Sequence, residues 1–248
     1  MKQIIRSIVR QIPNTLTLLN LLCGSLAVML AFRDYLLEAS ILIAAGFLFD
    51  LLDGTAARLL KAQSPIGLQL DSLADLITFG LAPAAILFGI QEQVGTEGPF
   101  SISMPTGTLI LRLLPFLLTI AAGLRLAKFN IDERQTHQFI GLPTPANGLM
   151  VLALPLVLSG QPASFLNTWL ANDLFIPVYS VTISYLMISP LRLYSIKIKG
   201  LGFQRNKFAF LFIAITLLLL IAFRQTGLFL IVPAYVVFGA IMALAMKE

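Results

Sequence analysis

Long apolar segments dominate this sequence and limit what it can fold into. Hydrophobic residues make up 58% of the 248 residues and charged residues only 12%, whereas a soluble domain carries about 25% charged residues. One soluble core cannot bury so much apolar surface. The hydrocarbon layer of a bilayer is roughly 30 Å thick and needs about 20 apolar residues per helical crossing. Several segments of that length predict an all-α, polytopic integral membrane protein.

Apolar segments between polar or Pro/Gly-containing breaks predict about eight transmembrane helices. Their expected ranges are 15–33, 36–60, 68–91, 107–129, 145–160, 174–190, 207–223 and 228–246. Before them, residues 1–13 carry Lys2, Arg6 and Arg10 on one helical face, which predicts an interfacial amphipathic helix that is not a cleaved signal. No repeat or composition change divides the chain, so residues 1–248 are expected to form a single membrane-embedded domain.

The basic residues predict the orientation of these spans. With eight spans, all Lys and Arg residues except Arg33, Arg112 and Arg224 fall on one side of the membrane. Cytoplasmic loops carry such an excess, so both termini are expected in the cytoplasm of a cell-membrane protein. This topology also explains the net charge of +5, and no nucleic acid is expected as a partner. A single cysteine and a single histidine exclude an intrachain disulfide and a Cys/His zinc cluster.

Four of the twelve acidic residues lie inside the second and third expected spans. They are Asp50, Asp53, Asp71 and Asp75. A carboxylate at the centre of a membrane helix costs about 2.5–3.5 kcal/mol on insertion scales, so such residues face a cavity and mark an ion or substrate site. Hydrogen bonds between helices are the alternative, and four groups of one sign disfavour it.

These aspartates and several very small residues form two helical stripes. The first follows i, i+3, i+4 and i+7 spacing: Asp50, Asp53, Gly54 and Ala57. The second repeats every four residues: Gly67, Asp71 and Asp75. Helices joined by a short connection are antiparallel neighbours, so we expect the stripes to face each other. The small residues would let a diphosphate and a base approach the backbone.

Facing carboxylates repel each other unless cations lie among them. Oxygen ligands suit Mg²⁺ or Mn²⁺, and two ions about 3.5–4 Å apart can clamp a phosphoryl group. Asp53 lies five residues before Arg58, which places the site about 7.5 Å below the cytoplasmic end of the helix. A cation or proton transporter is the alternative, although such proteins bind near the bilayer midplane between repeats.

The segment from Asp50 to Asp75 reads D-L-L-D-G-T-A-A-R, eight residues, G, three, D, three, D. It resembles the signature of the CDP-alcohol phosphatidyltransferase family at all eight fixed positions. The resemblance implies that the four aspartates bind divalent metal ions and that Asp75 is the general base. It also implies that Gly54, Ala57, Arg58 and Gly67 hold the CDP moiety of CDP-diacylglycerol. Arg58 suits a diphosphate because its guanidinium is planar and always charged, although a cation at a helix end can also simply reach the interface.

Two further segments, Arg125-Leu-Ala-Lys-Phe-Asn130 and Phe139-Ile-Gly-Leu-Pro-Thr-Pro145, resemble the phosphatidylserine synthase branch of this family. That branch commonly has arginine at the fourth position of the first segment, where Lys128 stands here. Pro13-Asn14, Thr17 and Asn20 are also similar to the branch, which extends the resemblance over roughly the first 150 residues.

The branch implies transfer of a phosphatidyl group from CDP-diacylglycerol to L-serine, with release of CMP, in phospholipid biosynthesis. Arg125, Lys128 and Asn130 are then candidates for binding serine, although Arg125 and Lys128 can also serve only as cytoplasmic anchors. Glycerol 3-phosphate, inositol phosphate and choline remain alternative acceptors. The first two carry a phosphate, which would need cations in the same way as the serine carboxylate. The resemblance further suggests a homodimer among membrane lipids.

Overall fold

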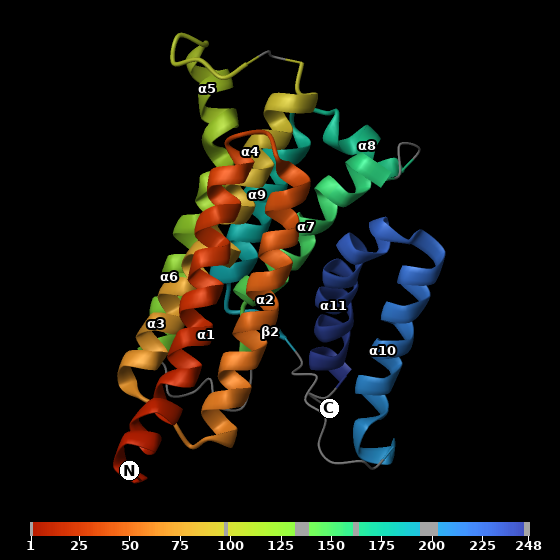
Figure 1. The fold of residues 1–248 in the computed structure, drawn as a ribbon. Coiled ribbons are helices and arrows are strands. Elements are labelled where there is room, and N and C mark those ends of the chain that lie inside the picture. Colours follow the sequence, from red (N-terminus) through yellow and green to blue (C-terminus); the bar gives the residue numbers. More distant parts are fainter. Residues whose placement is uncertain (1, 97–98, 132–138, 161–163, 194–202, 246–248) are drawn as a thin grey trace.

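The computed structural model describes residues 2–96, 99–131, 139–160, 164–193 and 203–245, which form a bundle of helices (Figure 1). The first half comprises α1 (Lys2–Ala31), α2 (Leu36–Leu59), α3 (Pro65–Asp75), the π-helix η1 (Leu76–Leu81) and α4 (Ala82–Val94). The second half comprises α5 (Thr106–Leu113), the 3₁₀ turn η2 (Leu114–Phe116), α6 (Leu117–Ile131), α7 (Thr144–Gly160), α8 (Phe165–Leu170), α9 (Phe175–Ile188), α10 (Phe203–Phe223) and α11 (Gln225–Ala245). Two short strands, β1 (Phe139–Ile140) and β2 (Arg192–Leu193), pair antiparallel and connect the start of α7 to the end of α9.

The all-α, polytopic prediction is confirmed. A helix coincides with each of the eight expected spans. Among the described residues, four helices are long and apolar enough to cross a membrane: Gln11–Ala31, Pro65–Val94, Thr106–Ile131 and Gln225–Met242. Three shorter apolar helices accompany them: Thr144–Gly160, Phe175–Ile188 and Lys207–Phe223. The short helix α8 was not expected, because its six residues are too few for a periodic pattern to reveal.

The helix expected over residues 1–13 continues without a break into the first span. Helix α1 runs from Lys2 to Ala31 with Pro13 inside it. A proline removes one backbone hydrogen bond and bends a helix, but membrane helices tolerate it where neighbouring groups satisfy the freed carbonyl. The location of the first turns at the membrane interface stays a prediction.

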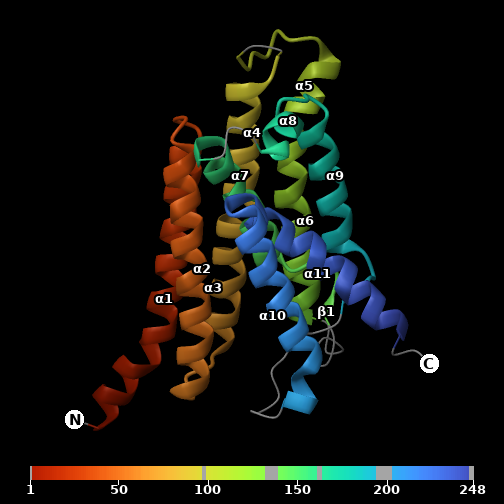
Figure 2. The ribbon, with the colours of Figure 1, turned by 90° about the vertical axis from the view of Figure 1, so that its right-hand side faces the viewer.

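Small residues let the first three spans pack closely. Helices α1 and α2 are antiparallel neighbours, and η1 lies against both (Figures 1 and 2). Gly24 of α1 and Gly46 of α2 both pack onto Thr78, where a β-carbon at either glycine would collide with the threonine. Small residues let membrane helices approach closely and make more van der Waals contacts. These contacts favour association in lipid, where the hydrophobic effect does not.

At the end of the bundle opposite the termini, Arg112 is buried and paired with an acid. Its Nη1 donates to Glu92 Oε1 at 2.8 Å, and the backbone N–H of Phe100 donates to Glu92 Oε2 at 2.8 Å. Nearby, the Thr96 hydroxyl donates to Asp173 and lowers the pKa of that carboxyl, to which Arg112 adds a smaller effect. Glu92 therefore compensates the charge of the buried Arg112.

Candidate active site

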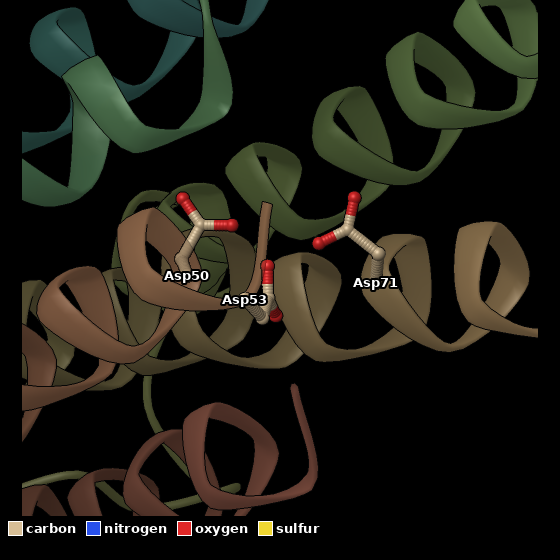
Figure 3. Close-up of side chains that lie close together, drawn as sticks. All are labelled: Asp50, Asp53 and Asp71. Carbon is tan, nitrogen blue, oxygen red and sulfur yellow. The ribbon is translucent and has the colours of Figure 1, made fainter. Parts of the chain in front are cut away.

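Helices α2 and α3 bring three aspartates together. Asp50 and Asp53 lie on α2 and Asp71 lies on α3, and one carboxylate oxygen of each lies within 4.8 Å of the others (Figure 3). Asp53 is buried, whereas Asp50 and Asp71 are half-buried. The expectation that the two acidic stripes face each other is met by these three residues.

Asp75 lies one turn beyond Asp71 and is buried with only 8% of its surface exposed. It is within electrostatic range of the other three aspartates and of Arg125. Its Oδ1 atom has no hydrogen-bond partner in the described part of the chain. Asp75 therefore borders the cluster of three carboxylates and keeps one oxygen available.

The donor set fits a hard divalent cation. Three carboxylates converge, and none of the four aspartates forms an ion pair with a described residue. Buried carboxylates need compensating positive charge. Oxygen ligands are those that Mg²⁺ and Mn²⁺ prefer, so a divalent ion would supply this charge. A bound ion would stabilise negative charge on phosphoryl oxygens.

Helix α1 supports the cluster from a third side. The Thr17 hydroxyl donates to Asp53 Oδ2 at 2.6 Å, so one oxygen of Asp53 is held in place. Asn14, Thr17 and Asn20 recur every three residues on one face of a largely apolar span. The sequence reasoning assigned no role to these residues, although polar residues at helical spacing in a membrane span were the available signal.

A cavity of about 580 Å³ opens beside the carboxylates. Residues from α1, α2, α3 and the α2–α3 connection line it, including Asp53, Asp71 and the predicted small residues Gly54, Ala57 and Gly67. Helix α1 packs against both α2 and α3 and so forms the third wall. The sequence-predicted stripes of small residues therefore border an open volume adjacent to the acidic cluster.

The two glycines of this cavity meet different surroundings. A β-carbon at Gly54 would have only Arg58 Nη1 nearby, at 3.7 Å, whereas one at Gly67 would lie 3.0 Å from both Asn14 Oδ1 and Ser64 Oγ. Ser64 also caps α3, since its hydroxyl accepts from the backbone N–H of Gly67 at 3.1 Å. Gly54 thus keeps the cavity open, while Gly67 in addition permits the approach of α1 to α3.

Arg58 is exposed and does not line the cavity itself. Its Nη2 lies 3.3 Å from Thr55 Oγ1, and its guanidinium runs back along α2 beside Gly54. An arginine side chain is long and flexible, with three methylene groups between the backbone and the guanidinium. The guanidinium of Arg58 could therefore reach a diphosphate in the cavity.

The three candidate serine-binding residues occupy different environments. Arg125 is buried, with 8% of its surface exposed, and lies within electrostatic range of Asp75. Asn130 Nδ2 donates to Ser72 Oγ at 2.9 Å and so connects α6 to α3. Lys128 is exposed. Of the three, the structure places Arg125 beside the acidic cluster.

The π-helix η1 begins directly after Asp75. In an α-helix, the Phe79 carbonyl would accept from residue 83, but Pro83 has no N–H. Asn147 of α7 satisfies that carbonyl instead, because its Nδ2 donates to Phe79 O at 3.1 Å. Tyr179 OH in turn donates to Asn147 Oδ1 at 3.1 Å. Single π turns occur frequently at functional sites, and Pro83 inside an expected helix was the sequence signal for this one.

These features define a polytopic membrane protein with a buried carboxylate cluster that fits divalent metal and opens onto a cavity lined by small residues. The sequence profile of the CDP-alcohol phosphatidyltransferase family matches residues 10–184. This chain belongs to the CDP-alcohol phosphatidyltransferase family, whose members are generally dependent on divalent metal ions.

Several curated relatives share most of the chain. It is 32% identical over 181 residues to the CDP-diacylglycerol–serine O-phosphatidyltransferase of Bacillus subtilis, covering 73% of this chain and 88% of that protein. Proteins of the same name from Helicobacter pylori and Mycobacterium leprae are each 32% identical over 185 residues. The alignment covers 70% of the former and 56% of the latter, so the chain spans little more than half of the mycobacterial relative.

Proposed function

We propose that this protein transfers the phosphatidyl group of CDP-diacylglycerol to L-serine, giving phosphatidylserine and CMP. The observation that carries the proposal is the convergence of three aspartates from α2 and α3 beside the cavity that Gly54, Ala57 and Gly67 line. Its relatives in Bacillus subtilis and Helicobacter pylori bear the name of this activity.

The acidic cluster holds Mg²⁺ or Mn²⁺ in this proposal, with room in the donor set for two ions. The ligands are Asp50, Asp53, Asp71 and Asp75. The cavity receives the CDP moiety, for which Gly54, Ala57 and Gly67 leave space and Arg58 supplies positive charge. A bidentate guanidinium contact to a diphosphate oxygen pair is of the kind that arginine favours.

Asp75 takes the proton from the serine hydroxyl, because its Oδ1 is buried, unpartnered and adjacent to the other aspartates. The serine oxygen forms a bond to the phosphorus that carries diacylglycerol, and the bond from that phosphorus to the CMP oxygen breaks. CMP leaves with the electron pair of that bond. Arg125 pairs with the serine carboxylate, while Asn130 fixes α6 against α3 and the exposed Lys128 adds positive charge to the same end of α6.

The site faces the cytoplasm in this proposal. Both chain ends and the α2–α3 connection lie toward the same end of the bundle (Figure 1), and the sequence predicts the excess of basic residues at that end. A soluble alcohol and a lipid phosphate can meet there, since the cavity lies at the ends of α2 and α3.

Release of CMP from CDP-diacylglycerol by the purified protein tests the proposal. L-Serine, glycerol 3-phosphate, inositol phosphate and choline are offered separately, each with Mg²⁺, with Mn²⁺ and with EDTA. We expect CMP release that depends on serine and on the metal. Release with another alcohol but not with serine would contradict the proposed acceptor, and equal release in EDTA would contradict the metal site.

A further inference from the structure

Several buried side-chain polar atoms outside the cavity have no hydrogen-bond partner in the described part of the chain. Four of them, on four different helices, are Asp75 Oδ1, Arg125 Nε, Thr144 Oγ1 and Ser184 Oγ. Thr144 is completely buried, and each of the other three side chains belongs to a residue that is 8% exposed. None of them lines the cavity beside Gly54. Most buried polar atoms in proteins are hydrogen-bonded, so several unpartnered atoms in one region indicate a missing ligand.

Asp75 and Arg125 lie at the same depth in the bundle. Two of the contacts between α6 and the continuous helix α3–η1 lie on either side of these residues: Asn130 to Ser72, and Ala122 to Gly80. Asp75 lies between Ser72 and Gly80, and Arg125 lies between Ala122 and Asn130. The two charged side chains are therefore enclosed between these contacts, in agreement with the electrostatic interaction between them.

Thr144 and Ser184 are enclosed in the same way between two contacts of α7 with α9. These contacts are the backbone hydrogen bond from Leu142 N to Leu186 O, at 3.0 Å, and the hydrogen bond from Tyr179 OH to Asn147 Oδ1, at 3.1 Å. Thr144 lies between Leu142 and Asn147, and Ser184 lies between Tyr179 and Leu186. The two hydroxyls therefore lie between the same two hydrogen bonds that connect residues 142–147 to α9.

The hydrogen bond from Asn147 Nδ2 to Phe79 O joins the two pairs. Asp75 lies four residues before Phe79, within one turn of η1, and Thr144 lies three residues before Asn147, about 4.5 Å along its axis. Both helices run away from the end of the bundle that holds the termini (Figures 1 and 2). The carboxylate, the guanidinium and the two hydroxyls thus belong to one layer of the bundle.

We infer that this layer binds the acceptor amino acid and that Thr144 and Ser184 are the residues that select it. The inference rests on the proposed function. An L-serine zwitterion offers a carboxylate to Arg125 and a hydroxyl proton to Asp75. Its ammonium group has three N–H donors, for which the oxygens of Thr144 and Ser184 are acceptors.

This arrangement separates serine from the other acceptor alcohols by its ammonium group. Glycerol 3-phosphate and inositol phosphate carry no N–H donors, and choline has a quaternary nitrogen. Each would leave the two buried hydroxyls unpaired, which a site built for hydrogen bonding disfavours strongly. The discrimination should therefore depend on the hydroxyls of α7 and α9 more than on the metal cluster.

Steady-state kinetics of Thr144→Val and Ser184→Ala test the inference, because both changes remove a hydroxyl with little change in volume. Ser180→Ala is the matched control, since Ser180 Oγ already donates to Ile176 O at 2.7 Å one turn away on α9. We expect each test variant to raise the KM for L-serine about ten- to hundredfold, as for the loss of a hydrogen bond to a charged group. The KM for CDP-diacylglycerol should stay unchanged, and Ser180→Ala should resemble the parent in both.

Two additions guard against variants that only perturb folding. Thr144→Ser and Ser184→Thr keep the hydroxyl and should retain most of the parent's affinity for serine. 3-Hydroxypropionate keeps the alcohol and carboxylate but lacks the ammonium group, so the double variant Thr144→Val/Ser184→Ala should lose most of the parent's preference for serine over this analogue. Persistence of that preference in the double variant would overturn the inference.

The outcomes distinguish the inference from the proposed function. A parent protein that releases CMP only with another alcohol would overturn the proposed function. A parent that uses serine, with variants that keep its KM for serine, would overturn the inference alone. Equal increases in KM for both substrates would also overturn it, because they would place the two hydroxyls at the shared phosphoryl centre or in the general packing.

Discussion

Asp53 differs from its neighbours in how firmly the fold holds it. It is 5% exposed, and the Thr17 hydroxyl fixes one of its oxygens at 2.6 Å. Asp50 and Asp71 are more exposed and lie across the cluster from each other on different helices. A fixed ligand with two adjustable ones suits a metal site that must accept a phosphoryl oxygen during turnover.

Replacing Asp53 or Asp71 by asparagine should abolish turnover while the protein still inserts in the membrane. The change removes one negative charge but little volume, and an amide oxygen at position 53 can still accept from Thr17. Mn²⁺ titration followed by electron paramagnetic resonance should show weaker binding, and CMP release at saturating Mn²⁺ should be lost. Glu38→Gln is the control, because Glu38 is an exposed acid on the same helix. Activity within a few fold of the parent would contradict the metal-ligand assignment.

Helical periodicity in the sequence predicted that the acidic stripes of two helices face each other, and three of the four aspartates do converge. Asp50, Asp53 and Asp71 converge because spacing of three and four residues fixes the face of each helix. The same reasoning could not find the Thr17 contact, since it depends on the rotation of α1 relative to α2. Nor could it assign different roles to Gly54 and Gly67. Only the structure shows that Asn14 of α1 lies against Gly67 and not against Gly54.

At the scale of elements, η1 connects the acidic cluster to the centre of the bundle. The range 68–91 was predicted as one uninterrupted helix, and its backbone does remain helical throughout. The π turn inserts an extra residue after Asp75, which changes the faces that later residues present. Apolar periodicity cannot reveal this shift, because three consecutive residues, Thr78, Phe79 and Gly80, are all buried.

Asn147→Leu should destabilise the protein and reduce turnover together. The substitution removes the side-chain donor to the Phe79 carbonyl, which Pro83 cannot replace, and a lost buried hydrogen bond costs about 1–3 kcal/mol. The η1 turn that follows Asp75 should then relax and move the proposed base. Thermal unfolding in detergent and CMP release measure the two effects.

Tyr179→Phe is the matched comparison for that prediction. It removes only the hydroxyl that donates to Asn147 Oδ1 and leaves the bond from Asn147 to Phe79 in place. We therefore expect a smaller loss of both stability and turnover. An Asn147→Leu variant as active and stable as Tyr179→Phe would show that the amide does not support the π turn.

The whole molecule joins two parts around the same layer of polar residues. The family profile ends at residue 184, and the hairpin of α10 and α11 follows it. Helix α11 packs against α7, and its Phe229 stacks near Tyr179 with ring centroids 6.2 Å apart. Tyr235 of α11 lies within electrostatic range of Arg125. Helix α11 of the C-terminal hairpin thus packs beside the proposed acceptor layer.

The orientation of the whole bundle gives the last prediction. Cys23 is buried, so a Cys23→Ala background permits single cysteines to be introduced at chosen sites. Arg33 lies in the α1–α2 turn, and Gln63 lies in the α2–α3 connection at the opposite end of the bundle. A membrane-impermeant maleimide should label Arg33→Cys from outside intact cells and Gln63→Cys only in inverted vesicles, because basic residues concentrate on the side of Gln63.

The same pair of variants tests where the nucleotide enters. Gln63 lines the cavity, so CDP-diacylglycerol with Mn²⁺ should slow labelling of Gln63→Cys in inverted vesicles, while Arg33→Cys should react at an unchanged rate. Labelling both after detergent solubilisation controls for intrinsic reactivity. Labelling of Gln63→Cys from outside intact cells would reverse the proposed topology. Correct sidedness without protection by the substrate would instead place the nucleotide elsewhere, because a ligand in this cavity must cover residue 63.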